Sequence, residues 1–211
     1  MIGITNFEAF LITSIILNVT PGNDTIYILS KTLAQGKKAG IISVLGISSG
    51  ILFHTILAVF GLSIIIAKSI FIFNIIKYAG ALYIIYLGYQ MFINKTALTT
   101  GTIQKSKDKN YWKIYQQGIL TNVLNPKVAL FFISVLPQFI KPELINSSAP
   151  FLILGVTFIA TATLWTLVLT IFASRIFYRL KENSKIAGCI NKICGATLIG
   201  LGIRVALTPR K

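Results

Sequence analysis

The chain has 211 residues, of which 55% are hydrophobic and 12% are charged, and its formal net charge is +15. A soluble domain carries about twice that charged fraction, so the composition excludes a soluble globular protein and indicates an integral membrane protein. The length excludes two large domains, and no hydrophilic segment is long enough to fold alone.

Six apolar runs have the length of about 20 residues that a helix needs to cross a bilayer. They fall at 6–29, 40–67, 70–93, 118–137, 150–174 and 186–207. The sequence therefore predicts an all-α, polytopic membrane protein with six transmembrane helices.

The first run is interrupted by the polar sequence Thr20-Pro21-Gly22-Asn23-Asp24. Proline cannot donate to the carbonyl four residues earlier, that of Leu17. Lipid cannot satisfy such a freed group, so the break must line a cavity enclosed by protein or filled with water. Because Thr20 is a good capping residue and Pro21 suits a first helical position, we expect the second half-helix to start at Pro21.

Asp24 is an acid well inside this apolar run, whereas Glu8 lies near its outer end. An acid within a membrane costs about 2.5–3.5 kcal/mol on insertion scales and is a functional candidate by default. Asp24 would receive a substrate ammonium or carry a proton. Two structural roles remain open: an acid stabilised by the dipole of its own helix, or a partner of Lys127.

The second run contains Gly46-x-x-x-Gly50, the spacing of small-residue helix contacts, and one histidine, His54. His54 suits either packing or proton coupling. The same glycines frame Gly46-Ile47-Ser48-Ser49-Gly50, which fits the nucleophile pattern of hydrolases. That pattern needs a strand–turn–helix elbow, which an apolar helix does not provide. We therefore expect no enzyme, no catalytic residue, no metal and no cofactor.

In the third run, Tyr83, Tyr86 and Tyr89 suit packing or interface anchoring as well as a cavity. The polar stretch from Asn94 to Gln117 then divides the chain. We expect a three-helix repeat at 1–93, a basic cytoplasmic linker at 94–117 and a second three-helix repeat at 118–211.

The fourth run is interrupted in the same way, by Asn122-Val123-Leu124-Asn125-Pro126-Lys127. Here Asn125 is the candidate cap and Pro126 the candidate first helical residue. Lys127 would meet a carboxylate, or would reach the interface if the span is shifted.

The two halves are similar to each other. Lys77-Tyr78-Ala79-Gly80-Ala81 resembles Lys192-Ile193-Cys194-Gly195-Ala196, and the two proline breaks lie at nearly the same spacing. An odd number of spans in each repeat makes the repeats inverted, with helices 1 and 4 broken. Two half-helix N-termini, each with a partial charge near +0.5, would then converge and suit a carboxylate.

Thirteen of the 20 lysines and arginines lie in the first, third and fifth connections between the runs. The positive-inside rule places these connections in the cytoplasm and both termini outside. The basic charge is thus an orientation signal, and we expect no nucleic-acid partner.

These features predict a secondary transporter for a small zwitterionic metabolite. The candidate substrate-binding residues are Asn18, Thr20, Pro21, Gly22, Asn23, Asp24, Asn122, Asn125, Pro126 and Lys127. The candidate proton-coupling residues are Asp24 and His54. The alternative is a passive channel or a membrane scaffold that transports nothing, but a channel would repeat polar residues along one helix face.

The breaks closely resemble those of the LysE/RhtB family of bacterial amino-acid exporters. The similarity runs through Thr20-Pro21-Gly22-Asn23-Asp24-Thr25, Gly36-Lys37-Lys38-Ala39-Gly40, Gly80-Ala81-x-Tyr83, Gly118 to Lys127 and Leu136-Pro137-Gln138-Phe139. The family usually has Pro-Gly-Pro at the first break, where this chain has Asn23 in place of the second proline.

The resemblance implies six spans in a bacterial inner membrane and export of amino acids, driven by the proton gradient. It does not identify the amino acid, because basic, neutral and sulfur-containing substrates occur with the same motifs. The glycine-rich spans are compatible with a homodimer and equally with close packing inside one monomer.

Overall fold

The protein is described by a computed structural model that covers residues 3–62, 70–93, 110–182 and 184–207. Within these ranges the chain is all-α, and its only extended pairing is an isolated bridge between Ile4 and Ile140. The expected cytoplasmic linker lies mostly at 94–109, outside the described residues.

The first half contains α1, α2, α3 and α5, with a π-helical turn after α3. Their bounds are Phe7–Val19, Asn23–Gln35, Lys37–Leu57, Ala58–Leu62 for the turn, and Ile70–Ile93. The second half contains α6, α7, α8 and α9, and α7 continues into one π-helical and one 3₁₀ turn. Their bounds are Tyr111–Val123, Pro126–Leu130, Phe131–Val135, Leu136–Phe139, Ser148–Glu182 and Ser184–Leu207.

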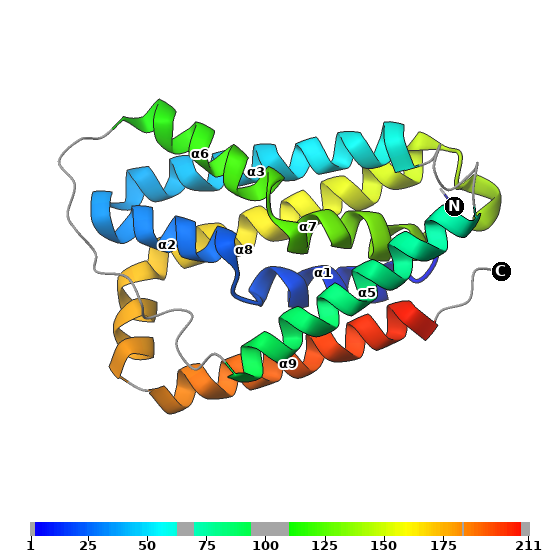
Figure 1. Ribbon diagram of the computed structural model, residues 1–211. Coiled ribbons are helices and arrows are strands. Elements are labelled where there is room, and N and C mark those ends of the chain that lie inside the picture. The colour runs from blue at the N-terminus through cyan, green and yellow to red at the C-terminus, as the bar shows by residue number, and fades with distance from the viewer. Residues whose placement is uncertain (1–2, 63–69, 94–109, 183, 208–211) are drawn as a thin grey trace.

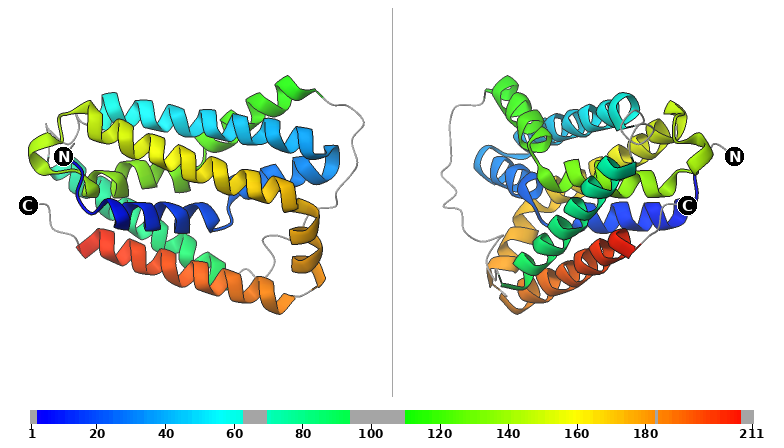
Figure 2. Two further views of the ribbon diagram at one scale, coloured as in Figure 1. Left: turned by 180° about the vertical axis from the view of Figure 1, so that it is seen from behind. Right: turned by 45° about the vertical axis from the view of Figure 1, so that its right-hand side comes forward.

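The helices run side by side along one long axis of the molecule (Figure 1). The beginning of α1 and the end of α9 lie at the same end of the molecule (Figure 2). The α2–α3 turn, the start of α6 and the α8–α9 turn lie at the opposite end (Figure 1). The first connection, the fifth connection and the start of α6 therefore share one end of the bundle.

Helices α3 and α6 approach closely because both carry glycine where they cross. A Cβ atom on Gly46 would lie 3.0 Å from the Cα of Gly118, and a Cβ on Gly50 would lie 2.6 Å from the Cβ of Asn122. The Gly46-x-x-x-Gly50 spacing therefore serves a contact within the monomer. It gives no support to a homodimer.

Helices α5 and α9 form the second close pair. A Cβ on Gly88 would lie 2.6 Å from the carbonyl oxygen of Gly195, and one on Gly202 would lie 2.8 Å from that of Ala81. Small residues thus let two backbones touch in a setting where lipid provides no hydrophobic drive for helix association. This pair forms one wall of the cavity described below.

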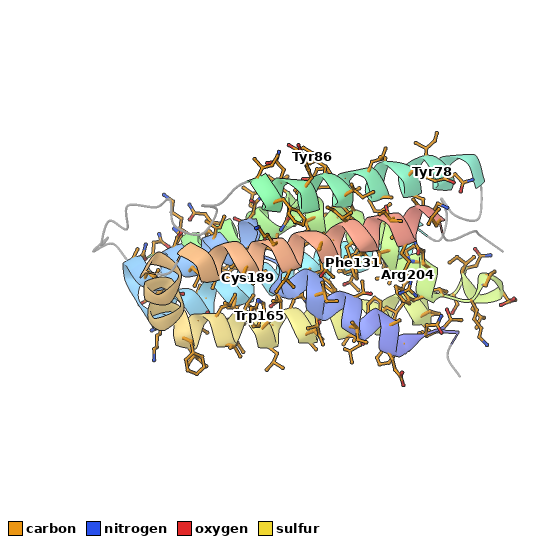
Figure 3. All side chains as sticks on the ribbon, turned by 90° about the horizontal axis from the view of Figure 1, so that it is seen from below. Tyr78, Tyr86, Phe131, Trp165, Cys189 and Arg204 are labelled. Atoms are coloured by element: carbon orange, nitrogen blue, oxygen red, sulfur yellow. The ribbon has the colours of Figure 1, made fainter. Side chains whose placement is uncertain are left out.

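An aromatic cluster joins α1, the turn after α7, and α8. The rings of Phe131 and Phe158 stack with centroids 4.7 Å apart, and the ring of Phe10 lies 6.0 Å from that of Phe131. All three side chains are buried, and Phe131 is labelled in the interior in Figure 3. This apolar core fixes the rotation of α1 and α7, and with it the positions of both breaks.

Among the described residues, two helices are long and apolar enough to cross a membrane, within Lys37–Phe60 and Ser148–Ala173. A third span arises if α6 and the stretch Pro126–Phe139, bent by 46° at the break, are counted together. The expectation of an all-α membrane protein is confirmed, whereas the count of six spans stays a prediction. Helix α6 already begins at Tyr111, inside the segment expected to be linker.

Candidate functional site

The first break separates α1 from α2 by three residues, and its capping differs from the expectation. Helix α2 begins at Asn23 and its N-cap is Gly22, in an extended conformation without a side-chain cap. Thr20 instead ends α1, because its hydroxyl donates to the carbonyl of Ile16 at 2.7 Å. The prediction that Thr20 caps a helix starting at Pro21 was wrong, since this hydroxyl bonds backward along its own helix.

Lys127, from the other half of the chain, closes the end of α1. Its Nζ donates to the carbonyl oxygens of Leu17 at 3.1 Å and Thr20 at 2.8 Å. The Leu17 carbonyl is the acceptor that Pro21 leaves without a helical donor. A cation at a helix C-terminus also stabilises the negative end of the helix dipole. Lys127 therefore makes good the hydrogen bond that the first proline removes.

The second break has the expected cap. The side chain of Asn125 accepts from the backbone N–H of Lys127 at 3.0 Å, and Pro126 is the first residue of α7. The carbonyl of Asn122, which Pro126 leaves free, accepts from the backbone N–H of Asn125 at 2.9 Å. It also lies 3.1 Å from Nε2 of His54 on α3. Each freed carbonyl thus meets a nitrogen-bearing side chain from another helix.

Asp24 lies between the first break, closed by Lys127, and the second break, capped by Asn125. Its Oδ2 accepts from Nδ2 of Asn122 at 2.8 Å, across the interface between α2 and α6. The carboxylate is also within electrostatic reach of Lys127 and His54. An acid and two basic side chains therefore share one small region, and each reduces the cost of keeping the others in an apolar span.

This region contains hydrogen-bonding capacity that the protein does not use. Three buried atoms of this region make no hydrogen bond of good geometry among the described residues: Oδ1 of Asp24, Oδ1 of Asn122 and Nδ2 of Asn125, although the Asn125 side chain lies close to the Asp24 carboxylate. Buried polar atoms are nearly always paired, so each such atom calls for an explanation. Their concentration around Asp24 makes this region the candidate site.

A cavity of about 360 Å³ lies beside the two breaks. Seven of the ten residues proposed to bind substrate line it: Thr20, Pro21, Gly22, Asn23, Asn125, Pro126 and Lys127. Its other walls come from Ile26 of α2, from α5 through Tyr83, Tyr86, Leu87 and Gln90, and from Leu198 of α9. The tertiary structure thus brings both breaks to one hollow.

The remaining three candidates lie elsewhere. Asp24 and Asn122 are not among the cavity-lining residues and face the α3–α6 side of the break. Asn18 donates to the hydroxyl of Thr161 on α8 at 3.1 Å and so joins two helices. His54 touches the second break through the Asn122 carbonyl and packs against Phe132, with ring centroids 5.8 Å apart.

The cavity wall formed by α5 was the part of the site that the sequence predicted least well. Tyr83 and Tyr86 suited packing as well as a cavity, and nothing singled out Ile26, Leu87 or Leu198. The spacing of Tyr83, Tyr86 and Gln90, at i, i+3 and i+7, is the signal that places them on one helix face. Figure 3 shows Tyr86 on α5, the helix beside α9.

Ser48 lies in the middle of α3, where its hydroxyl is 2.8 Å from that of Thr163 on α8. The strand–turn–helix elbow of a hydrolase is therefore missing at this motif. The described residues also contain no group of three or more histidine, cysteine or acidic side chains able to hold a metal ion.

The sequence model of the family described as LysE type translocator matches residues 15–208. The chain belongs to this family. The resemblance seen at the two breaks is thereby confirmed, and a LysE type translocator is a transporter and not an enzyme. The chain is a multi-pass membrane protein.

Curated relatives cover nearly the whole translocator. The uncharacterized membrane protein YrhP of Bacillus subtilis is 36% identical over 207 residues, which are 95% of this chain and 98% of YrhP. The homoserine/homoserine lactone efflux protein of Salmonella typhimurium is 30% identical over 198 residues, 94% of each chain. An uncharacterized membrane protein of Vibrio cholerae is 28% identical over 198 residues, 94% of this chain and 95% of that one. No solved structure matches this LysE type translocator.

Proposed function

We propose that this translocator exports small amino acids across the bacterial cytoplasmic membrane in exchange for protons. The observation that carries the proposal is the cavity beside the two breaks, lined by Lys127 and lying near the partly buried Asp24. A zwitterion presents a carboxylate and an ammonium, and this site offers a cation at its surface. Efflux by the Salmonella typhimurium relative supports the direction of transport.

In this mechanism Lys127 attracts the substrate carboxylate and Asp24 carries the proton. The cation lies in the cavity wall, while the carboxylate of Asp24 is turned toward Asn122 and His54. Asp24 binds a proton from the outer side and releases it to the cytoplasm, and substrate moves the opposite way. The unpartnered Oδ1 of Asp24 is the atom that would bind this proton.

We further propose that the cavity faces the cytoplasm in this conformation. Its lining on α5 runs from Tyr83 to Gln90, toward the C-terminal end of that helix, and this end lies on the same side of the bundle as the α8–α9 turn (Figure 1). The positive-inside rule makes that end cytoplasmic and puts both termini outside. Protease cleavage of a terminal tag from the cytoplasmic side only would overturn this orientation.

The two halves, 1–93 and 118–211, are proposed to be inverted repeats that rock around the breaks. Each half has the order broken helix, long helix, long helix, which supports the proposal. Inverted repeats with discontinuous helices at the substrate site are typical of alternating-access carriers.

Proteoliposomes test the function directly. We expect purified protein to exchange labelled amino acid against unlabelled amino acid, and to accumulate it when a pH gradient is imposed. Currents far above carrier turnover, with no saturation by amino acid, would instead identify a channel. Absence of both exchange and current would leave the scaffold as the function.

A further inference from the structure

The described residues that line the cavity carry charge of one sign only. Of the 13 described residues that line it, Lys127 is the charged one, and none is an aspartate or glutamate. The nearest acid, Asp24, hydrogen-bonds Asn122 and does not line the cavity. A second cationic group, carried on the side chain of a substrate, would therefore meet no acidic side chain among the described lining residues.

The wall opposite the breaks is neutral and amphipathic. Nε2 of Gln90 donates to the hydroxyl of Tyr86 at 2.8 Å, and the rings of Tyr83 and Tyr86 lie 6.1 Å apart. Ile26, Leu87 and Leu198 supply the apolar part of the lining. These groups can pack against methylenes and hydrogen-bond an uncharged polar end, but they cannot neutralise an ammonium or guanidinium group.

Gly22 keeps the cation at the cavity surface. A Cβ atom at this position would lie 3.1 Å from Nζ of Lys127, so glycine leaves room for the ammonium beside the first break. Among the described lining residues, the charge therefore lies at the break end of the cavity, and those from α5 are uncharged. A bound amino acid would place its carboxylate toward Lys127 and its side chain toward α5.

We propose that the α5 wall, through Gln90, Tyr86 and Tyr83, selects amino acids with an uncharged side chain and rejects those with a cationic one. The proposal rests on the proposed function and specifies its substrate class. The physical reason is charge: a side-chain ammonium would find no acidic side chain among the described lining residues, while Lys127 repels it.

Lysine and norleucine form a matched pair of ligands, because they share one carbon chain and differ by the terminal ammonium. We expect norleucine to compete at least about tenfold better than lysine for counterflow in proteoliposomes, a difference of about 1.4 kcal/mol. Equal competition by the two would overturn the selectivity.

One substitution should remove the preference for norleucine over lysine. Gln90→Glu places an acid on the α5 wall, so lysine should compete at least about tenfold better than in the wild type. Gln90→Met, which has similar length and no charge, should give no such gain. A gain for lysine in both variants would show that loss of the amide, and not the new charge, is responsible, and would contradict the proposal.

A binding measurement separates this proposal from the proposed function. The thermal stability of the purified full-length protein is measured with norleucine and with lysine. Stabilisation by norleucine alone, in a protein that transports neither, would overturn the proposed export and leave the selectivity standing. Equal or absent stabilisation by both would overturn the selectivity.

Discussion

At the first break, three residues separate α1 from α2, and the carbonyl freed by Pro21 bonds a lysine from the other half of the chain. At the second break, two residues separate α6 from α7, and the carbonyl freed by Pro126 bonds the N–H of Asn125, three residues away. At the second break the freed carbonyl is therefore satisfied mainly by a neighbouring backbone N–H. The first depends on a long-range cation.

This difference indicates which break responds to charge. Nζ of Lys127 donates to the carbonyl oxygens of Leu17 and Thr20 at the end of α1. These hydrogen bonds weaken if Lys127 moves toward a substrate carboxylate. The cap of α7 by Asn125 does not involve an ionised group. The five sets of changes below probe the two breaks and the acid beside them, first by transport and then by stability, each from the largest expected effect to the smallest.

Asp24→Asn should lower proton-driven export by about 100-fold or more, since an amide cannot carry the proton and effects of this size follow loss of a proton-transfer group. Folding should be kept, because the amide oxygen can still accept from Asn122. Export under an imposed pH gradient measures the effect. Glu8→Gln, at an exposed acid of α1, is the control and should leave export unchanged. Wild-type accumulation by Asp24→Asn would show that Asp24 is structural.

Pro126→Ala should slow transport about tenfold, a change of about 1.4 kcal/mol. The new N–H at position 126 can bond the Asn122 carbonyl and straighten the second break, where Leu124 already has φ −87° and ψ 4°. Pro21→Ala should have a smaller effect, because the extended Gly22 keeps α1 and α2 apart. Initial counterflow rates compare the two variants, and a larger loss in Pro21→Ala would reverse the comparison.

Lys127→Met should lower the free energy of unfolding by about 1–3 kcal/mol, because it leaves the Leu17 carbonyl of the first break without its donor. The matched change at the second break is His54→Phe, which keeps a ring against Phe132. It should cost less than about 1 kcal/mol, since the Asn122 carbonyl retains the N–H of Asn125. Thermal unfolding in one detergent compares them. Equal losses would refute a difference in how the breaks are closed.

Asn125→Ala should lower the free energy of unfolding by about 1 kcal/mol, the usual value for an N-cap. Thr20→Val, at the corresponding position before the first proline, should change it by about 0.5 kcal/mol or less, because Thr20 caps no helix start. The same unfolding assay applies. A larger loss for Thr20→Val would mean that its hydroxyl supports the first break in a way that its bond to Ile16 does not explain.

Asn23→Pro, which restores the proline that the family usually has, should raise the free energy of unfolding by about 0.5 kcal/mol. Asn23 is the first residue of α2, where a helix does not use the N–H, and the extended Gly22 suits a residue before proline. This is the smallest of the five effects. A loss of more than about 1 kcal/mol would show that the Asn23 side chain or N–H makes a needed contact.

The sequence was enough to predict the fold class, both broken helices, the Asn125 cap and the location of Asp24 beside a break. Each follows from rules that act over a few residues: apolar run length, the missing N–H of proline and the preference of asparagine for an N-cap. The wrong cap at Thr20 shows the limit of such rules. A threonine before proline can bond forward or backward, and the sequence does not decide between the two.

Tertiary structure alone decided which groups meet at the breaks. The contact of Lys127 with Leu17 spans 110 residues, and that of His54 with Asn122 spans 68. The α5 wall joins the cavity because glycines set the approach of α5 to α9 and an aromatic core sets the rotation of α1 and α7. Hydropathy and capping determine where a helix starts and ends. Side-chain packing determines how the helix is rotated against its neighbours, and that rotation decides which residues meet at the site.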